Sequence, residues 1–263
     1  NGLITYEFDE KLTPAILSAA HELGYRGALL GLWNPKARRE IEAAAETIRQ
    51  FHSKLALAVV IGNEGLIDNR YTTADIEQAA GQLLALLPPE IAIPVTTSEP
   101  IGEYGLPELR SFGDFLAPNI HPAIDLEGAD PAAGAVWVRK RAQTLAAVAG
   151  KPVLVKETGM PNGGGPRHTP DSQRQFWEAY LREGPLAVID TPVRTWISYA
   201  AAFEAFDMQW KAEKTGSLIE GHWGFLNASR KPYPVFETWS LAFTSGRTIK
   251  NAAQGACRSD GKR

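Results

Sequence analysis

The sequence predicts an α/β fold in which a parallel sheet closes as a (β/α)8 TIM barrel. Apolar segments of strand length alternate with amphipathic helical segments along the chain. No linker or change in composition divides the 263 residues, and one such barrel takes about 250 residues. We therefore expect a single domain over residues 1–247, followed by a polar, disordered tail over residues 248–263.

Seven strands are predicted, and each is an apolar run that ends at turn-forming or polar residues. In chain order they are Leu3–Phe8, Gly27–Trp33, Ala56–Ile61, Ala92–Thr97, Phe115–Ile120, Pro152–Lys156 and Thr195–Phe203. A closed barrel of this type has eight strands. We therefore expect the first strand to be absent from this sequence, so that the seven segments are barrel strands 2 to 8.

The segments between the strands carry apolar residues at helical spacing and signals for the start of a helix. Pro14 follows Thr13 at a position that suits the first helical turn, and Ile76, Ala80 and Leu83 share one face of a helix. The predicted helices are Thr13–Leu23, Pro35–Phe51, Thr73–Leu87, Ala132–Ala149, Ser172–Glu183 and Val235–Phe243. Strands that alternate with helices imply a parallel sheet with right-handed crossovers.

Composition excludes several classes of function. The net charge of −3, from 27 basic and 30 acidic residues, leaves no basic surplus for nucleic acid or an anionic membrane. No run of 18 apolar residues could span a membrane. The single cysteine, Cys257, cannot form an internal disulfide. The five histidines show no His-x-x-x-His spacing, so we expect neither a metal nor another cofactor.

Two glutamates stand at the ends of predicted strands. Glu157 follows the apolar run at 153–155, and Glu64 follows the run at 59–61 within Gly-Asn-Glu-Gly. Alone, either glutamate could cap a helix or join a salt bridge. The two strands are three apart, however, and the carboxyl ends of barrel strands form one mouth. A pair of carboxyl groups across a cleft, one neutral and one charged, is typical of glycoside hydrolysis.

Five motifs in the same order resemble the large clan of retaining (β/α)8 glycosidases, and within it the bacterial and fungal branch of glycoside hydrolase family 17. That family contains β-1,3-glucanases and β-1,3-glucanosyltransferases. The motifs are Asn63-Glu64, Asn119–Pro122, Lys156–Pro161, Phe203–Lys211 and Glu220–Asn227. The sequence departs from the family at Met160, where tryptophan is usual, and at Met208, where many members have an acid. The first departure changes a wall of the cleft and leaves the glutamate pair intact.

The resemblance implies a role for each matched residue. Glu157 would be the nucleophile, Glu64 the acid and then the base, and Asn63 a hydrogen-bond donor to the sugar 2-hydroxyl. A lysine near Glu157 would keep that carboxylate ionised. The implied substrate-binding set also contains a charged network of Glu204, Asp207, Lys211 and Glu220, the aromatic side chains of Tyr6, Trp33, Trp210 and Trp223, and His121.

Several of these residues have a structural alternative. Trp33 and Trp210 are as consistent with packing as with stacking on a sugar. His121 is either a substrate contact or a hydrogen-bonded structural histidine. Glu99, at the end of another predicted strand, is either a third carboxylate of the cleft or a structural residue.

Two functional hypotheses follow. In the first, the chain is a retaining enzyme of β-1,3-glucan, either a transglycosylase, which the motifs favour slightly, or an endo-glucanase. In the second, it is a barrel that binds glucan without turning it over; the presence of Glu64, Glu157, Asn63 and Lys211 favours the first. We expect a monomeric bacterial protein that binds β-1,3-glucan oligosaccharide or polysaccharide and no nucleic acid. We also expect a periplasmic or extracellular location, with an export signal upstream of Asn1.

Overall fold

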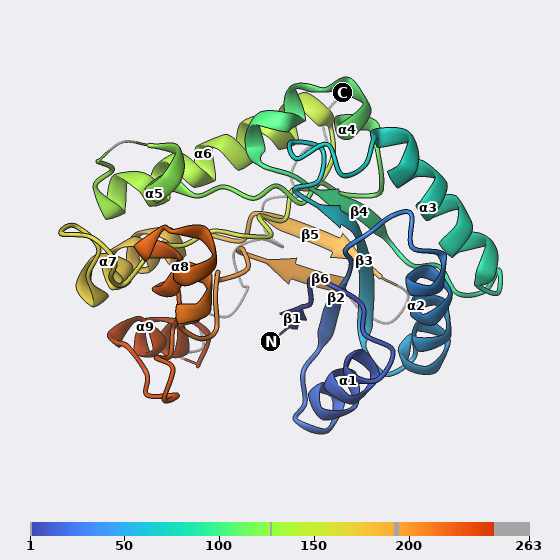
Figure 1. Cartoon of the computed structure of the whole chain (residues 1–263), viewed down its shortest axis with the longest axis horizontal. Coiled ribbons are helices and arrows are strands. Elements are labelled where there is room, and N and C mark those ends of the chain that lie inside the picture. Colours follow the sequence, from blue (N-terminus) through green and yellow to red (C-terminus); the bar gives the residue numbers. More distant parts are fainter. Residues whose placement is uncertain (1, 127, 192–194, 245–263) are drawn as a thin grey trace, which may run out of the picture.

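A parallel sheet of four strands, paired in chain order, forms the first half of the fold in the computed structural model of the protein (Figure 1). The strands are β1 (Gly2–Ile4), β2 (Gly27–Leu32), β3 (Ala56–Asn63) and β4 (Val95–Ser98). The structure describes residues 2–126, 128–191 and 195–244. The tail expected over residues 248–263 lies outside these ranges.

Single parallel bridges continue the order of the sheet beyond β4. They join Pro100 to Asn119, Asn119 to Glu157, and Thr158 to Ala202. Seven segments thus follow one another side by side in chain order, which is the arrangement of a TIM-barrel α/β fold. Between β1 and the segment around Ala202, the described residues show no bridge.

Several predicted strands differ from the structure. The strand expected over Ala92–Thr97 begins at Val95, and the segments expected over Phe115–Ile120 and Pro152–Lys156 form isolated bridges instead of strands. The strand expected over Leu3–Phe8 ends at Ile4. Beyond it a side chain replaces the backbone acceptor of the strand pairing, because the Gly31 amide donates to Thr5 Oγ1 at 3.1 Å. The strand expected over Thr195–Phe203 is divided. Its first half, β6 (Thr195–Ser198), pairs antiparallel with β5 (Ala187–Asp190), which the sequence did not predict because a four-residue apolar run gives too short a signal.

Most helices lie outside the sheet and agree with the predicted ones to within three residues at each end (Figure 1). They are α1 (Leu12–Glu22), α2 (Arg38–Phe51), α3 (Thr73–Leu86), α6 (Pro131–Ala149), α7 (Pro170–Leu181) and α9 (Pro234–Thr244). Shorter elements occupy the loops: η1 (Ile101–Gly105), α4 (Pro107–Ser111), α5 (Pro122–Asp125), α8 (Gln209–Thr215) and η2 (Leu218–Gly221). Within the described ranges, none of these helices is long and apolar enough to cross a membrane.

Side-chain caps fix where the main helices begin. The Thr72 hydroxyl accepts from the Asp75 amide while the Asp75 carboxylate accepts from the Thr72 amide, a reciprocal capping box at the start of α3. Thr169 and Ser172 form the same arrangement at the start of α7. Asp130 caps α6. These contacts satisfy amides that a helix start otherwise leaves unpaired.

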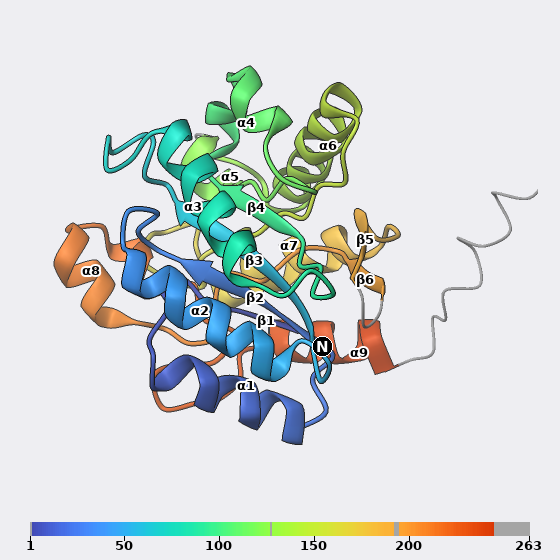
Figure 2. The same ribbon diagram turned by 90° about the vertical axis from the view of Figure 1, so that its right-hand side faces the viewer.

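Successive side chains along a strand point to opposite faces of the sheet. The apolar side chains therefore form an outer set, which faces the helices, and an inner set on the other face. On β3, Val59 and Ile61 pack in the outer cluster with the helices, whereas Val60 packs in the inner cluster. The inner cluster consists of Leu29, Ala58, Val60, Phe115, Ala117, Leu154, Ala187 and Ile189. Its last two members come from the hairpin β5–β6, which therefore packs on the inner face. Figure 2 shows this hairpin and α8 on opposite sides of the strands.

Replacement of Phe115 by alanine tests the inner cluster. The side chain is fully buried, so Phe115→Ala is expected to lower the free energy of unfolding by about 3–5 kcal/mol through lost burial and a cavity. Urea denaturation measures the change. The matched control is Leu23→Ala, since Leu23 is 77% exposed and its loss is expected to cost no more than about 0.5 kcal/mol. A cost at Phe115 as small as that of the control would contradict the inner packing.

Candidate active site

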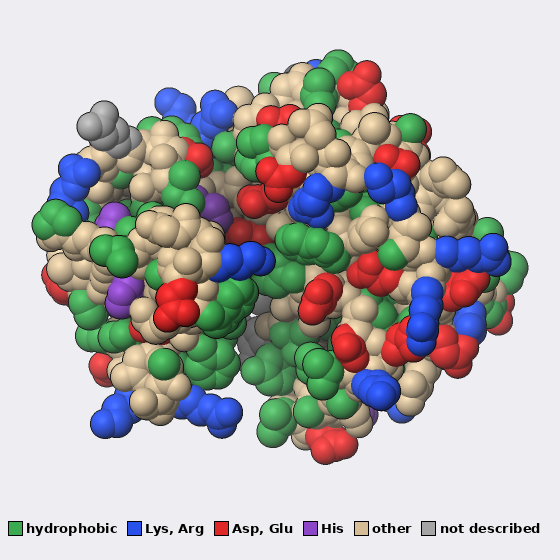
Figure 3. All heavy atoms as spheres, viewed as in Figure 1, with side chains coloured by type: hydrophobic (Ala, Val, Ile, Leu, Met, Phe, Trp, Pro, Cys, Tyr) green, Lys and Arg blue, Asp and Glu red, His purple; other side chains and the backbone are tan. Residues whose placement is uncertain are grey.

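Four strand ends are held side by side at one edge of the sheet. The Glu64 amide donates to the Ser98 carbonyl at 2.9 Å, the Asn119 amide to the Glu99 carbonyl at 3.0 Å, and the Ile120 amide to the Glu157 carbonyl at 2.9 Å. Acidic side chains lie in the central hollow of the face seen in Figure 3, with a histidine and a basic side chain beside them. The backbone pairing thus brings polar side chains from separate parts of the sequence together at this edge of the sheet.

A chain of hydrogen bonds connects the two glutamates. Asn119 Nδ2 donates to Glu64 Oε1 at 2.9 Å and to Asn63 Oδ1 at 3.2 Å. Lys156 Nζ donates to the same Asn63 oxygen at 2.8 Å and to Glu157 Oε1 at 2.8 Å. Glu64 and Glu157 therefore belong to one cluster, joined through two amide side chains and one ammonium group.

Asn119 and Lys156 were absent from the predicted site. Ser98 Oγ donates to Asn119 Oδ1 at 2.9 Å, which turns the Asn119 amino group toward Glu64. Both residues stand at the ends of predicted strands, so the rule that singled out the glutamates also applied to them. Their partners lie on other strands, and sequence spacing alone does not supply such pairings.

Glu157 is held in its ionised form. Burial would raise its pKa, but the Lys156 ammonium and His121 oppose burial and lower the pKa to about 2. The side chain is only 6% exposed, and His121 Nε2 lies 3.3 Å from Glu157 Oε2. A carboxylate that is charged and shielded from water is available to act as a nucleophile.

Glu64 shifts in the opposite direction. Burial is the main cause that raises its pKa, and the negative charge of Glu157 raises it further. The hydrogen bond from Asn119 and the charges of His121 and Lys156 offset part of this rise. Two neighbouring carboxyl groups whose pKa values are pushed apart can serve as a proton donor and a charged partner.

The aromatic ring of Tyr6 lies beneath this cluster. Lys156 Nζ sits 4.0 Å from the ring centroid, within the range of a cation–π contact. Burial raises the pKa of the Tyr6 hydroxyl well above its ordinary value, and the Glu157 charge adds to the rise. Tyr6 therefore stays neutral beside the ionised glutamate.

A second lysine, Lys211, pairs with Glu204 instead of Glu157. Lys211 Nζ donates to Glu204 Oε2 at 2.6 Å and lies 4.6 Å from the ring centroid of Phe203. Burial raises the pKa of Glu204, Lys211 lowers it, and the charges of Glu157 and Glu220 raise it again. Lys211, which was expected to keep Glu157 ionised, thus pairs with Glu204, and the lysine beside Glu157 is Lys156.

Asp207 lies outside the charged network in which it was expected. Its carboxylate accepts from Asn162 Nδ2 at 2.9 Å, from the Gly224 amide at 2.9 Å and from the Tyr233 hydroxyl at 2.7 Å. These neutral donors make Asp207 a brace between loops, because a buried carboxylate needs all of its oxygens satisfied. In the described part of the chain, the hydrogen bonds of this carboxylate go to these three donors, and Lys211 pairs with Glu204 instead.

The four aromatic side chains predicted to stack on sugars divide into buried and accessible ones. Trp223 is fully buried, and its ring packs edge-on against His121 and Phe203, so it presents no free face. Trp33 is 39% exposed and Trp210, on α8, is 55% exposed. The Arg70 guanidinium covers the Trp33 ring at 4.5 Å. Stacking on a sugar therefore stays a prediction for Trp33, Trp210 and Tyr6.

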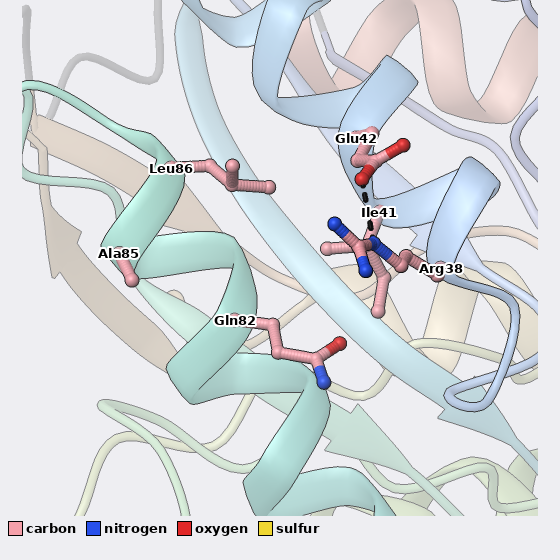
Figure 4. A pocket seen from close by; sticks show the side chains of 6 residues that line it. All are labelled: Arg38, Ile41, Glu42, Gln82, Ala85 and Leu86. Carbon is pink, nitrogen blue, oxygen red and sulfur yellow. Dashed lines mark hydrogen bonds and ion pairs between the residues drawn. The ribbon is translucent and has the colours of Figure 1, made fainter.

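A pocket on the outside of the molecule is separate from this cluster. It lies between α2 and α3 (Figure 4) and is lined by Arg38, Ile41, Glu42, Gln82, Ala85 and Leu86. Arg38 and Glu42 form an ion pair of 2.7 Å there. None of the residues of the glutamate cluster lines it. In the part of the chain that the structure describes, no group of three His, Cys, Asp or Glu side chains is placed to hold a metal ion.

The chain is similar to proteins with glycoside hydrolase domains. The family model described as "BtgE/BtgC glycoside hydrolase domain" matches residues 2–224. The protein named "Putative glucan endo-1,3-beta-glucosidase btgC", from Aspergillus niger (strain ATCC MYA-4892 / CBS 513.88 / FGSC A1513), is 28% identical over 89% of this chain. The match covers 37% of that relative, so this chain spans little more than a third of its length.

Two solved structures show the same fold. An active-site mutant of the Rhizomucor miehei β-1,3-glucanosyltransferase in complex with laminaritriose has a TM-score of 0.67 at 22% identity, with 89% of this chain and 85% of that chain covered. A plant β-glucan endohydrolase has a TM-score of 0.57 at 16% identity, with 88% and 97% covered. At these identities the likeness concerns the fold.

The buried Lys156–Glu157 pair predicts a pH-dependent loss of stability in Lys156→Met. Removal of one partner leaves a buried charge, so the free energy of unfolding at about pH 7 is expected to fall by about 3–5 kcal/mol. The pKa of Glu157 is lowered from 4.5 to about 2 in the folded protein. The stability from this shift is complete above the ordinary pKa and is lost as pH falls toward 2, so the deficit of the variant should shrink over that window.

Urea denaturation from about pH 7 down to about pH 3 measures this deficit. Arg38→Met is the matched control, because its side chain is 84% exposed and its ion pair is worth at most about 1 kcal/mol. A deficit for Lys156→Met that is the same at every pH would contradict the pairing with Glu157.

Proposed function

Because the chain belongs to the BtgE/BtgC glycoside hydrolase domain family, we propose that it is a retaining glycosidase that acts on β-1,3-glucan. The observation that carries the proposal is the pair Glu64 and Glu157, which are joined through one hydrogen-bonded cluster and whose pKa values shift in opposite directions. The substrate class rests on the names of the similar proteins, a glucan endo-1,3-β-glucosidase and a β-1,3-glucanosyltransferase.

The proposed reaction has two steps. In the first, a Glu157 oxygen attacks the anomeric carbon, the bond from that carbon to the leaving oxygen breaks, and Glu64 gives its proton to the leaving oxygen. In the second, Glu64 takes a proton from water or from a sugar hydroxyl, whose oxygen attacks the anomeric carbon and releases Glu157. The low pKa of Glu157 and the raised pKa of Glu64 suit the first step.

Asn63 supports this reaction through the orientation of its amide. Its Oδ1 accepts from both Lys156 and Asn119, so its amino group faces away from these donors. That group is available to donate to the sugar 2-hydroxyl, a contact that strengthens as charge develops on the ring. Lys156 thus serves two residues at once, since it also neutralises Glu157.

The second step decides between hydrolysis and transfer, and we propose transfer to a sugar hydroxyl. The motif at 203–211 has the sequence Phe-Glu-Ala-Phe-Asp-Met-Gln-Trp-Lys. This sequence favours the branch of glycoside hydrolase family 17 in which transferases are common. We also propose an extracellular location, because β-1,3-glucan is a polymer of the cell envelope. A bacterial, periplasmic setting and a monomeric state stay predictions; the two relatives on whose names the substrate class rests come from Aspergillus niger and Rhizomucor miehei.

A non-catalytic glucan-binding barrel is the competing hypothesis. A binding-only site has no need for a carboxylate that is buried at 6% exposure against an ammonium group. Such a pair costs desolvation free energy that stacking and neutral hydrogen bonds would avoid. The charged cluster therefore favours an enzyme.

The roles of the glutamates are tested by alanine variants and azide. Glu157→Ala should lose at least about 10⁴-fold in turnover, on the scale seen for other nucleophiles. Azide should restore part of it and give a glycosyl azide of inverted configuration. Glu64→Ala should lose about 10²–10⁴-fold on glucan, but should keep the first step on an activated aryl glycoside. Azide rescue of Glu64→Ala with inversion would mean that the roles are reversed.

The substrate and the second step are tested with laminari-oligosaccharides. The wild-type protein should convert them to products that include chains longer than the substrate, which mass spectrometry or chromatography detects. Glu157→Ala is the matched control and should give none of these products. Products that are only shorter would identify a hydrolase. Activity on cellulose or xylan, with none on laminarin, would overturn the substrate class.

A further inference from the structure

The turn that carries Glu64 has a strained backbone. Glu64 has φ of +50°, in the left-handed region that side chains other than glycine rarely adopt. Such a conformation costs on the order of 1–3 kcal/mol and persists only when its surroundings hold it. The Glu64 amide donates to the Ser98 carbonyl, and Arg70 donates to the Asn63 and Gly65 carbonyls. The two amides that follow Glu64 are held by other groups.

Glu99 holds the two amides that directly follow Glu64. This fully buried carboxylate accepts from the Gly65 amide at 3.2 Å, from the Leu66 amide at 3.3 Å and from the Tyr71 hydroxyl at 2.8 Å. The Tyr71 hydroxyl in turn accepts from the Gly65 amide at 2.9 Å. Glu99 and Tyr71 together thus fix the backbone on the C-terminal side of Glu64.

The Tyr71 ring fixes the same turn by packing. A Cβ atom added at Gly65 would lie 2.0 Å from the Tyr71 ring, and one added at Gly62 would lie 2.4 Å from its hydroxyl oxygen. The ring therefore rests directly on both glycines that flank Asn63 and Glu64. Gly62 itself has φ of +82°.

We propose that Glu99 is a positioning residue that acts through Tyr71 and the Gly65 and Leu66 amides to hold Glu64 in the geometry needed for proton transfer. The proposal rests on the proposed glycosidase function. All of the hydrogen bonds of the Glu99 carboxylate go to Tyr71 and to this turn in the described part of the chain. Glu99 is therefore neither a third carboxylate of the cleft nor a brace for a remote element.

The cost of keeping a carboxyl group at this place supports a role for it. Burial raises the pKa of Glu99 to about 7, even though Tyr71 and the two amides oppose the rise. The folded state therefore disfavours the ionised carboxylate, and a well-packed neutral side chain would avoid that penalty. Local features that cost stability without an evident structural gain are expected at functional sites.

The proposal predicts a selective defect. If Glu64 moves, protonation of the leaving oxygen suffers. The attack by Glu157 is less affected, because Asn63, the residue of this turn that supports it, is held separately by Lys156 and Asn119. Tyr71→Phe keeps the ring on both glycines and removes only the hydroxyl. Glu99→Gln keeps the shape and replaces one of the two acceptor oxygens by an amino group. In both variants kcat/KM on laminari-oligosaccharides should fall about 10–100-fold, as for a catalytic group displaced by about 1 Å. On a dinitrophenyl β-laminaribioside, whose leaving group needs no proton, kcat/KM should change little.

Tyr180→Phe is the matched control. It also removes a buried tyrosine hydroxyl, one that donates to the Tyr199 carbonyl at 3.1 Å outside the site. Its kcat/KM should equal that of the wild type on both substrates. Losses of equal size on both substrates in Tyr71→Phe and Glu99→Gln would mean a general structural role and would overturn the proposal.

A crystal structure of Glu99→Gln gives a readout that does not depend on activity. The proposal expects residue 64 to leave the left-handed region or Glu64 Oε1 to move away from Asn119 Nδ2. If both stay as they are in the wild type, the positioning role is wrong. A wild-type protein that acts on neither substrate would overturn the proposed function, and the position of Glu64 in this crystal structure would still decide between the outcomes for Glu99.

Discussion

The ammonium group of Lys156 is the interaction on which the rest of the site depends. It is buried, with 1% of its side chain exposed, and it lies between Asn63 Oδ1, Glu157 Oε1 and the ring of Tyr6. A buried cation is tolerated only where it is paired and hydrogen-bonded. The same contacts keep Glu157 ionised and orient Asn63. This one charge is thus the largest influence that keeps the nucleophile candidate ionised, and it helps to orient the amide beside it.

The fold separates an apolar end of the barrel from a polar one. The hairpin β5–β6 fills the inner face with Ala187 and Ile189, which pack against the strands. The polar side chains stand beyond this packing, where the strands end and the backbone of one segment hydrogen-bonds the next. The carboxyl groups are therefore shielded by protein, Glu157 almost completely and Glu64 in part. This partial burial raises the pKa of Glu64 without enclosing it.

The sequence predicted what depends on local pattern, and it failed where partners come from distant segments. Strand–helix alternation located the helices, and polar residues after apolar runs located Glu64 and Glu157, because both signals are contained in a few consecutive residues. The resemblance to the glycosidase family placed Asp207 in the Lys211 network and Trp223 on the sugar. The structure instead pairs Asp207 with Asn162 and Tyr233 and buries Trp223 against His121. A charge or a ring on a loop carries no local information on which neighbour it will meet.

The coupling between the two glutamates also bears on the second step of the proposed reaction. The charge of Glu157 is one cause of the raised pKa of Glu64. When Glu157 bonds covalently to the sugar, that charge is gone, while the Lys156 and His121 contributions, which lower the pKa of Glu64, persist. The pKa of Glu64 must then fall, so Glu64 loses its proton more easily in the glycosyl-enzyme. In its ionised form it can act as the base that takes a proton from the incoming hydroxyl. The same pair of charges therefore suits Glu64 to be the acid before the bond forms and the base afterwards.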